Sequence, residues 1–374
     1  AAGGDMDDRQ VFAIKGNCWS PKLSPDQTRV VFSSYVNGKG QIYTVNADAT
    51  VETGPPGTKR LNKPYMDTTG MHWRSGISFG FKAEGVNNSN NNHCEHSPVW
   101  SPDGRRIAYV SDRDVDWEIY LMNADGSDRR RLTRSPGIDR APAWSPDGNQ
   151  IAFESNRNGD FDIYLIGCDG TDEIALVKRS GDDSEPCWSP DGVRIACVSN
   201  QHNSFQDITI VDTKTHGVIY PKGLTRPATS WWVYDRLHDI RWSPDNRYIA
   251  AAFESSDMGH GFGILVARAD GTEVKELVTA PLRKPHPGGT NRPLLGGWYL
   301  DGSASHPFVV PTFRDLAWSP DSKTIAFRSD LDPSGYEFFY TVPAQGGEVT
   351  RLSNTLSPMG LKNEPKPLNV SGQP

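Results

Sequence analysis

The sequence predicts an all-β fold, a β-propeller of six four-stranded blades with long loop insertions on one rim. Three observations carry this prediction. The pentapeptide Trp-Ser-Pro-Asp-Gly occurs three times at a constant interval of 44 residues. Each copy is followed by short β-forming segments separated by turns. A single sheet of this kind cannot bury both of its faces, so it needs neighbours of its own type, and a period near 44 residues with four strands per unit is typical of propeller blades.

The clearest unit covers residues 98–133. In the turn at 101–104, proline fixes one φ and glycine supplies a positive one. A polar hairpin is expected at 112–116 and a further turn at 123–126. The four strands are predicted at Ser97–Trp100, Arg106–Ser111, Trp117–Met122 and Arg129–Leu132.

Six units are expected along the chain. The exact repeats have their serines at 101, 145 and 189, and degenerate copies lie at 24, 243 and 319. The blades are predicted at about 17–61, 96–133, 140–178, 184–224, 237–278 and 312–353. One propeller domain then covers 1–353, with insertions at about 62–95, 227–236 and 279–311, and a proline-rich arm covers 354–374. The two wide gaps between repeats leave part of a seventh blade as an alternative.

The three insertions are predicted between the outer strand of one blade and the inner strand of the next. Such connections gather around one mouth of a propeller channel, and long loops in compact domains often carry function. We therefore expect the functional site at this rim. Gln10–Ile14 is expected to form a further strand that completes the last blade.

Composition narrows the class of protein. The net charge is −7, from 39 basic and 46 acidic residues, which gives no field suited to nucleic acid or an anionic membrane. No apolar run approaches the roughly 18–20 residues of a membrane span. The sequence starts Ala-Ala-Gly-Gly, which fits the product of signal-peptide cleavage, so a periplasmic or secreted protein is expected.

The five cysteines are too few for a disulfide scaffold and form no CxxC motif. Cys187 and Cys197 flank a repeat turn at positions that are apolar in other blades, which favours buried core thiols. A Cys18–Cys94 link stays open, as does the disulfide state of Cys187 and Cys197.

The start of each inner strand faces the channel in the predicted register. The polar side chains there suit a polar ligand, although a water-filled channel would be lined in the same way. Two imidazoles and a carboxylate could also hold a divalent metal, with calcium, manganese or zinc as candidates. The predicted channel-lining residues are His96, Arg140, Glu185, His238, Asp239, Arg314 and Asp315, with His96 and His238 as the metal ligands.

The insertions carry aromatic residues that could bind sugars or a protein partner, or could simply pack the insertions onto the blades. The predicted rim aromatics are Trp73, Trp231, Trp232, Tyr234 and Trp298. The acidic hairpins at 112–116 and 156–162 resemble half of a calcium loop, but they lack its closing glutamate. We expect ordinary turns there, with Asp and Asn side chains bonded to backbone.

The repeats WSPDGRRIAYVSDRDVDWEIYLMNADG and WSPDGNQIAFESNRNGDFDIYLIGCDG resemble those of TolB-type β-propellers. The resemblance is close in blades two to four and looser in the others, and it does not extend to the insertions. It implies a periplasmic protein that receives a partner at its channel mouth. Oligogalacturonate lyases have similar repeats, and that likeness implies a histidine-bound metal in the channel and β-elimination as the reaction.

Two functional hypotheses follow. The first is an exported binding or assembly subunit that engages a partner protein through the channel-mouth rim, without a cofactor of its own. The alternative is a metal-assisted lyase acting on acidic oligosaccharides, with His96 and His238 holding the metal and Arg140 or Arg314 pairing with a uronate carboxylate.

Overall fold

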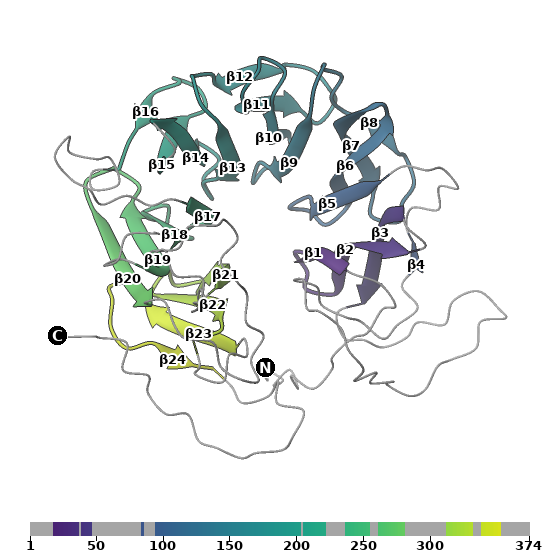
Figure 1. Cartoon of the computed structure of the whole chain (residues 1–374). Helices are drawn as coiled ribbons and strands as arrows, with labels where there is room; N and C mark the ends of the chain where they lie inside the picture. Colours follow the sequence, from purple (N-terminus) through teal and green to yellow (C-terminus); the bar gives the residue numbers. More distant parts are fainter. Residues whose placement is uncertain are drawn as a thin grey trace, which may run out of the picture. The chain divides into compact units, whose positions relative to one another are not determined.

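The computed structural model describes residues 18–36, 39–46, 84–85, 94–202, 205–221, 236–254, 261–280, 312–331 and 338–352. Within these ranges the chain forms β-strands, turns and connecting segments (Figure 1). The strands make six four-stranded sheets, and in each sheet the strands follow one another in chain order. No helix in the described part of the chain is long and apolar enough to cross a membrane. The prediction of an all-β fold with six four-stranded blades is confirmed.

Two compact units divide the chain at residues 175 and 176. The first unit holds blades one and two and most of blade three. Blade one contains β1 (Cys18–Leu23), β2 (Arg29–Val36), β3 (Lys39–Asn46) and β4 (Glu84–Gly85). Blade two contains β5 (Glu95–Trp100), β6 (Arg106–Asp114), β7 (Asp116–Asn123) and β8 (Arg130–Arg131). Blade three contains β9 (Asp139–Trp144), β10 (Gln150–Ser155), β11 (Asp162–Gly167) and β12 (Ile174–Val177), which straddles the boundary.

The second unit holds blades four to six. Blade four contains β13 (Asp183–Trp188), β14 (Arg194–His202), β15 (Phe205–Asp212) and β16 (Val218–Ile219). Blade five contains β17 (Arg236–Trp242), β18 (Tyr248–Glu254), β19 (Phe262–Arg268) and β20 (Val274–Ala280). Blade six contains β21 (Phe313–Trp318), β22 (Thr324–Ser329), β23 (Phe338–Pro343) and β24 (Thr350–Arg351).

The first insertion differs from its prediction. The outer strand of blade one is β4, which pairs with β3 through Tyr43 and Thr44. β4 lies inside the segment 62–95 that was predicted to connect blades one and two. The long excursion in this blade therefore runs between its third and fourth strands, because β3 ends at Asn46 and β4 begins at Glu84. Sequence patterns place so short an outer strand poorly, since two residues carry no periodicity.

The repeated Ser-Pro-Asp turn is closed by its own side chains. In blade three, Ser145 Oγ donates to Asp147 Oδ1 at 2.6 Å and accepts from Gln150 N at 2.9 Å. Asp147 Oδ1 also accepts from Asn149 N at 3.1 Å, and the Ser145 bond is the main reason that the pKa of Asp147 lies below its usual value. The same pair of serine bonds closes the turns at Ser24, Ser101, Ser189, Ser243 and Ser319. The repeated serine and aspartate therefore have a structural role in all six blades.

In blades two, three, five and six the repeated tryptophan joins the blade to the preceding one. Trp144 Nε1 donates to the backbone oxygen of Val99 at 3.2 Å. Arg106 of the preceding blade stacks on the Trp144 ring at 4.8 Å and donates to Gly148 O at 2.8 Å. Equivalent indole bonds, at 3.0–3.1 Å, are made by Trp100 to Lys22, Trp242 to Cys187 and Trp318 to Arg241.

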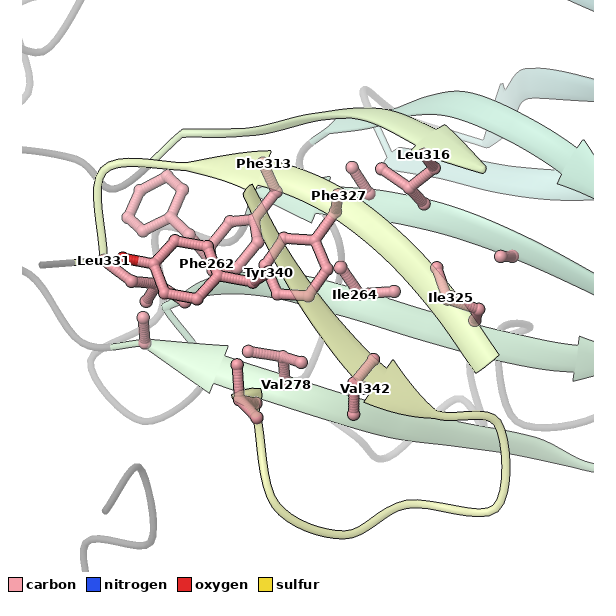
Figure 2. Close-up of a cluster of buried hydrophobic side chains, with 14 of the residues drawn as sticks. Phe262, Ile264, Val278, Phe313, Leu316, Ile325, Phe327, Leu331, Tyr340 and Val342 are labelled. Atoms are coloured by element: carbon pink, nitrogen blue, oxygen red, sulfur yellow. The ribbon is translucent and has the colours of Figure 1, made fainter. Parts of the chain in front are cut away.

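Within each unit the core lies between consecutive blades. Figure 2 shows the cluster between blades five and six, where Phe262 and Ile264 of β19 meet Phe327 and Tyr340 of blade six. A second cluster joins Val31 and Ile42 of blade one to blade two. Since these neighbours pack directly on each other, neither wide gap between repeats inserts a seventh blade between them.

The cysteines in the described residues are free thiols. Cys197 is fully buried in the core of blade four, as predicted, whereas Cys187 is half-buried. The side chain of Cys18 lies outside the described part of the structure, so the Cys18–Cys94 link stays a prediction. The expected strand at Gln10–Ile14 and the arm at 354–374 lie outside the described residues.

Candidate functional site

Each inner strand, meaning the first strand of each blade, carries a bulge near its start. In blade two, His96 pairs with Val110 and Val99 with Ala108, so Ser97 and Pro98 together oppose Tyr109. The first bulge residue has a positive φ of 52–57° in all six blades, although none is glycine. These residues are Ser20, Ser97, Ala141, Glu185, Asp239 and Asp315. A bulge of this kind re-aims neighbouring side chains at the strand start.

The predicted site residues fall at these bulges. His96, Arg140, His238 and Arg314 directly precede the bulge, and Glu185, Asp239 and Asp315 are its first residue. We call this end of each blade the bulge end. The end with the Ser-Pro-Asp turns is called the turn end. The residues inferred from the repeats thus occupy equivalent positions in their blades, and their place in a channel lining stays a prediction.

His96 is a partly buried, neutral imidazole. Its Nδ1 lies 2.9 Å from Ser97 Oγ, within hydrogen-bond distance, and its ring centre lies 4.7 Å from that of Trp117. Burial is the main cause that lowers the pKa of His96 below 6.5, while Asp112 opposes this shift. The ring is thus uncharged at neutral pH and packs against an aromatic neighbour.

Arg140 is held by its own blade. Its Nε donates to Glu154 Oε2 at 2.6 Å, and its guanidinium carbon lies 3.8 Å from the centre of the Phe161 ring. Glu154 is almost fully buried, while the Arg140 side chain is 44% exposed. The arginine therefore neutralises a buried carboxylate and still presents part of its guanidinium to solvent.

Two of the predicted acidic residues link successive blades of the second unit. Glu185 Oε2 of blade four accepts from Asp239 N of blade five at 2.8 Å. Asp239 Oδ2 in turn accepts from Leu316 N of blade six at 2.7 Å. Asp239 also pairs with Arg241. These carboxylates satisfy backbone donors at the bulges, which is a structural role that the sequence analysis did not assign to them.

His238 is also neutral at physiological pH. Its Nε2 lies 3.7 Å from Glu254 Oε1, and Arg236 Nη1 lies 3.9 Å from the same oxygen. Burial, as the largest cause, and the charges of Arg236 and Arg314 together lower the pKa of His238 to about 4, while the charge of Asp239 opposes this shift. Because the imidazole is neutral, the contact with Glu254 is not a salt bridge. Asp315, which is largely exposed, pairs with Arg328 at 2.8 Å.

No group of three or more His, Cys, Asp or Glu residues in the described ranges is arranged to hold a metal ion. His96 belongs to the first unit and His238 to the second. Their joint role as metal ligands stays a prediction. The predicted rim aromatics lie outside the described residues.

The sequence analysis missed the buried ion pairs at the bulge end. Glu95 pairs with Arg113, and Asp139 pairs with Arg157 at 3.2 Å. Both carboxylates begin an inner strand and are almost completely buried. In each pair the arginine follows the acid by 18 residues, a spacing within the repeat that could have revealed them. Such pairing is what allows a charged group to remain buried.

The acidic hairpins close onto the segment before each inner strand. Asp112 Oδ1 accepts from Cys94 N, and Asn156 Oδ1 accepts from Ile138 N, both at 2.7 Å. The expectation that these side chains bond to backbone is confirmed, but the bonded residue lies 18 positions away rather than in the turn itself. The hairpin is also tighter than predicted, because β6 and β7 leave only Val115 between them.

Consecutive four-stranded blades, joined by indole bonds and inter-blade cores, define a β-propeller repeat protein. Residues 80–225 match the family described as the TolB beta propeller domain. This matched part of the chain, which includes blades two to four, thus carries TolB-like β-propeller repeats.

Individual relatives match only short segments. The chain is 30% identical over 112 residues to Tol-Pal system protein TolB of Methylococcus capsulatus, covering 30% of this chain and 23% of that protein. It is 54% identical over 43 residues to Tol-Pal system protein TolB of Thioalkalivibrio sulfidiphilus, covering 12% and 10%. The matched segments thus span less than a quarter of these relatives' lengths.

A solved structure supports the fold over a wider range. Hydrazine synthase of Kuenenia stuttgartiensis is similar over 90% of this chain and 80% of that chain, with a TM-score of 0.52 and 12% identity. At this identity the likeness concerns the fold alone.

Proposed function

We propose that this chain is an exported binding and assembly subunit that engages a partner protein at the bulge ends of its blades, without a cofactor of its own. The observation that carries the proposal is the match of its repeats to proteins named for the Tol-Pal system. Propellers with similar repeats have different functions, so the choice between a binding subunit and an enzyme must also rest on the residues of the candidate site. The periplasmic or secreted location follows from the same resemblance and is tested by fractionating the host cell.

The chemistry of the bulge ends supports binding rather than acid–base catalysis. Glu185 and Asp239 bond to backbone donors of the following blade. Arg140 neutralises the buried Glu154. Burial lowers the pKa values of both histidines, that of His238 to about 4, so both imidazoles are uncharged at neutral pH and neither is a general acid there.

The bulge end of blade two also offers a contact point. Val115 forms the tip of the β6–β7 hairpin and is 92% exposed, with exposed aspartates on either side. Its φ of 88° is unusual for a β-branched residue. An exposed apolar side chain held in such a conformation, with acidic neighbours, fits an apolar socket bordered by basic residues on a partner.

The experiment compares tagged protein expressed in its own host and isolated under native conditions. We expect the wild type to elute as an assembly larger than the monomer, with cross-links concentrated at the bulge ends. Val115→Asp should reduce the assembled fraction at least several-fold. Val193→Asp is the matched control, because Val193 is exposed at a turn end and its replacement should leave assembly unchanged. A wild type that runs as a clean monomer contradicts the proposal.

The lyase alternative leads to different results. It requires stoichiometric metal in the purified protein, and an unsaturated product absorbing in the ultraviolet from acidic oligosaccharides. Elemental analysis of folded protein therefore separates the two functions without a choice of substrate. Metal at one equivalent, lost in a His96→Ala or His238→Ala variant that still folds, would favour the lyase.

A further inference from the structure

A cluster of buried charged groups lies at the bulge end between blades two and three. Glu118 of β7 is fully buried, and its Oε2 accepts from Thr133 Oγ1 at 2.6 Å while its Oε1 pairs with Arg131. Asp139 of β9 is also fully buried and accepts from Ser135 Oγ at 3.0 Å. The segment that leads from β8 to β9 is thus held between two buried carboxylates from neighbouring blades.

The polar and charged groups around Glu118 come from β6, β8 and β9 and from the loop after β10. β8 contributes Arg131, and β9 contributes Asp139, whose own partner is Arg157 of the loop after β10. From β6, Ser111 lies directly opposite Glu118 and accepts from Arg113 Nε at 3.4 Å. Arg157 also pairs with Glu173. The cluster therefore has nearly balanced charge, and adding one proton changes that balance.

Glu118 is the member of this cluster that titrates near neutral pH. Burial, as the largest cause, and the charge of Asp139 raise its pKa from 4.5 to about 7, although the bonds to Thr133 and Arg131 act in the opposite direction. Both protonation states are therefore populated in the physiological range.

Arg131 connects the buried acid to the surface. Its Nη1 lies 3.5 Å from Asp114 Oδ2, so the guanidinium is shared between Glu118 below and Asp114 at the end of β6. Tyr120 donates its hydroxyl to the same Asp114 oxygen. Asp114 immediately precedes Val115, the strained tip of the hairpin. The ion pair between Arg131 and Asp114 therefore acts on the residue next to that tip.

We propose that Glu118 and Arg131 form a pH-sensitive latch that controls how tightly the hairpin at 112–116 is held. When Glu118 is ionised, Arg131 donates a hydrogen bond to it and also pairs with Asp114 at the longer distance of 3.5 Å. When Glu118 binds a proton, it ceases to be a charged partner, and Asp114 becomes the stronger acceptor for Arg131. The acid form therefore holds the hairpin more firmly than the basic form. The latch formed by Glu118 and Arg131 is independent of the proposed function, because it requires no ligand or partner at the hairpin.

The test is hydrogen exchange of the peptide covering 112–117 in the intact chain at pH 6 and pH 8, corrected for the intrinsic pH dependence of exchange. We expect several-fold slower corrected exchange at pH 6, with a midpoint near 7. Glu118→Gln should give similarly slow corrected exchange at both values. Arg131→Gln should give fast exchange at both. Glu173→Gln is the matched control, because Glu173 pairs with Arg157 rather than Arg131, and it should keep the wild-type pH dependence.

A second variant, Asp139→Asn, keeps the proposal testable if Glu118→Gln does not fold. Because Asp139 raises the pKa of Glu118, Asp139→Asn should move the exchange midpoint to lower pH. Corrected exchange that is independent of pH in the wild type would overturn the proposal. So would a pH dependence that survives in folded Glu118→Gln.

Discussion

Replacing the repeat serine in two different blades tests how burial determines the contribution of the Ser-Pro-Asp turn to the free energy of unfolding. In Ser145→Ala, the turn loses a bond to Asp147 Oδ1 at 2.6 Å and one from Gln150 N at 2.9 Å. Ser319→Ala loses equivalent bonds, at 2.7 Å to Asp321 and 2.9 Å from Thr324 N. The difference is that Ser145 is only 3% exposed, whereas the Ser319 turn lies nearer to solvent.

The expected losses follow from that difference. Each bond contributes about 1 kcal/mol net, and a buried donor left without a partner costs a further 1–3 kcal/mol or so. Ser145→Ala should therefore lower the free energy of unfolding by about 2–3 kcal/mol. Ser319→Ala should lower it by about 1 kcal/mol, because water can replace the hydroxyl. Urea unfolding monitored by tryptophan fluorescence measures both, provided that the m-value is unchanged.

The pH dependence provides a second check on the same variant. The Ser145 bond holds the pKa of Asp147 below its usual value, so its contribution to stability is present above the unfolded pKa and is lost as pH falls. The penalty of Ser145→Ala should shrink below about pH 4. Equal losses in the two variants, or a Ser145→Ala loss below about 0.5 kcal/mol, would refute the reasoning, because two hydrogen bonds at a buried site cannot contribute so little.

Three further predictions concern other features of the scaffold. Val115→Gly should raise the free energy of unfolding by about 0.5–1 kcal/mol in thermal unfolding, since the positive-φ penalty exceeds the entropic cost of glycine; a loss of stability would contradict this. Trp144→Phe should lower the free energy of unfolding by about 2–3 kcal/mol, because it removes the hydrogen bond to Val99 O and leaves that acceptor unpaired. An unchanged midpoint of urea unfolding would contradict this prediction. When the pH is lowered from 9 to 5, the free energy of unfolding of the wild type should increase by up to about 3 kcal/mol relative to that of Glu118→Gln. The reason is that the raised pKa of Glu118 makes its buried anion unfavourable above pH 7. Parallel curves of stability against pH for the two proteins would refute this prediction.

The repeat determined most of the fold in advance. The bonds between Ser145 and Asp147 recur in all six copies, and the bond of Trp144 to the preceding blade recurs in blades two, five and six. One sequence motif therefore implied both the turn and its place in the blade. The degenerate copies keep the same backbone without glycine. Asn246 and Ser322 have φ values of 62° and 60°, close to the 68° of Gly104. The backbone geometry is thus imposed by the serine and aspartate bonds rather than by glycine alone.

The site was predicted less completely, because its chemistry depends on contacts between distant parts of the sequence. The repeat register placed His96 and Arg140 at the bulge end correctly. It could not show that Arg140 neutralises Glu154, since that pairing depends on how the two strands are aligned. Nor could it show that Glu118 is buried against Asp139 of the next blade. Burial of a charge is a property of packing, which sequence periodicity does not report.

Residues that depart from a repeat are natural candidates for function, but the bulges give a structural reason for some of these departures. In blades two to four the second bulge residue is proline, which has no N–H to satisfy. In blade six that position is Leu316, whose N–H requires an acceptor, and Asp239 of the preceding blade supplies it. Asp239 therefore compensates for the proline that blade six lacks at this position. The departures without such a partner, above all the strained and exposed Val115, are the better candidates for contact with another molecule.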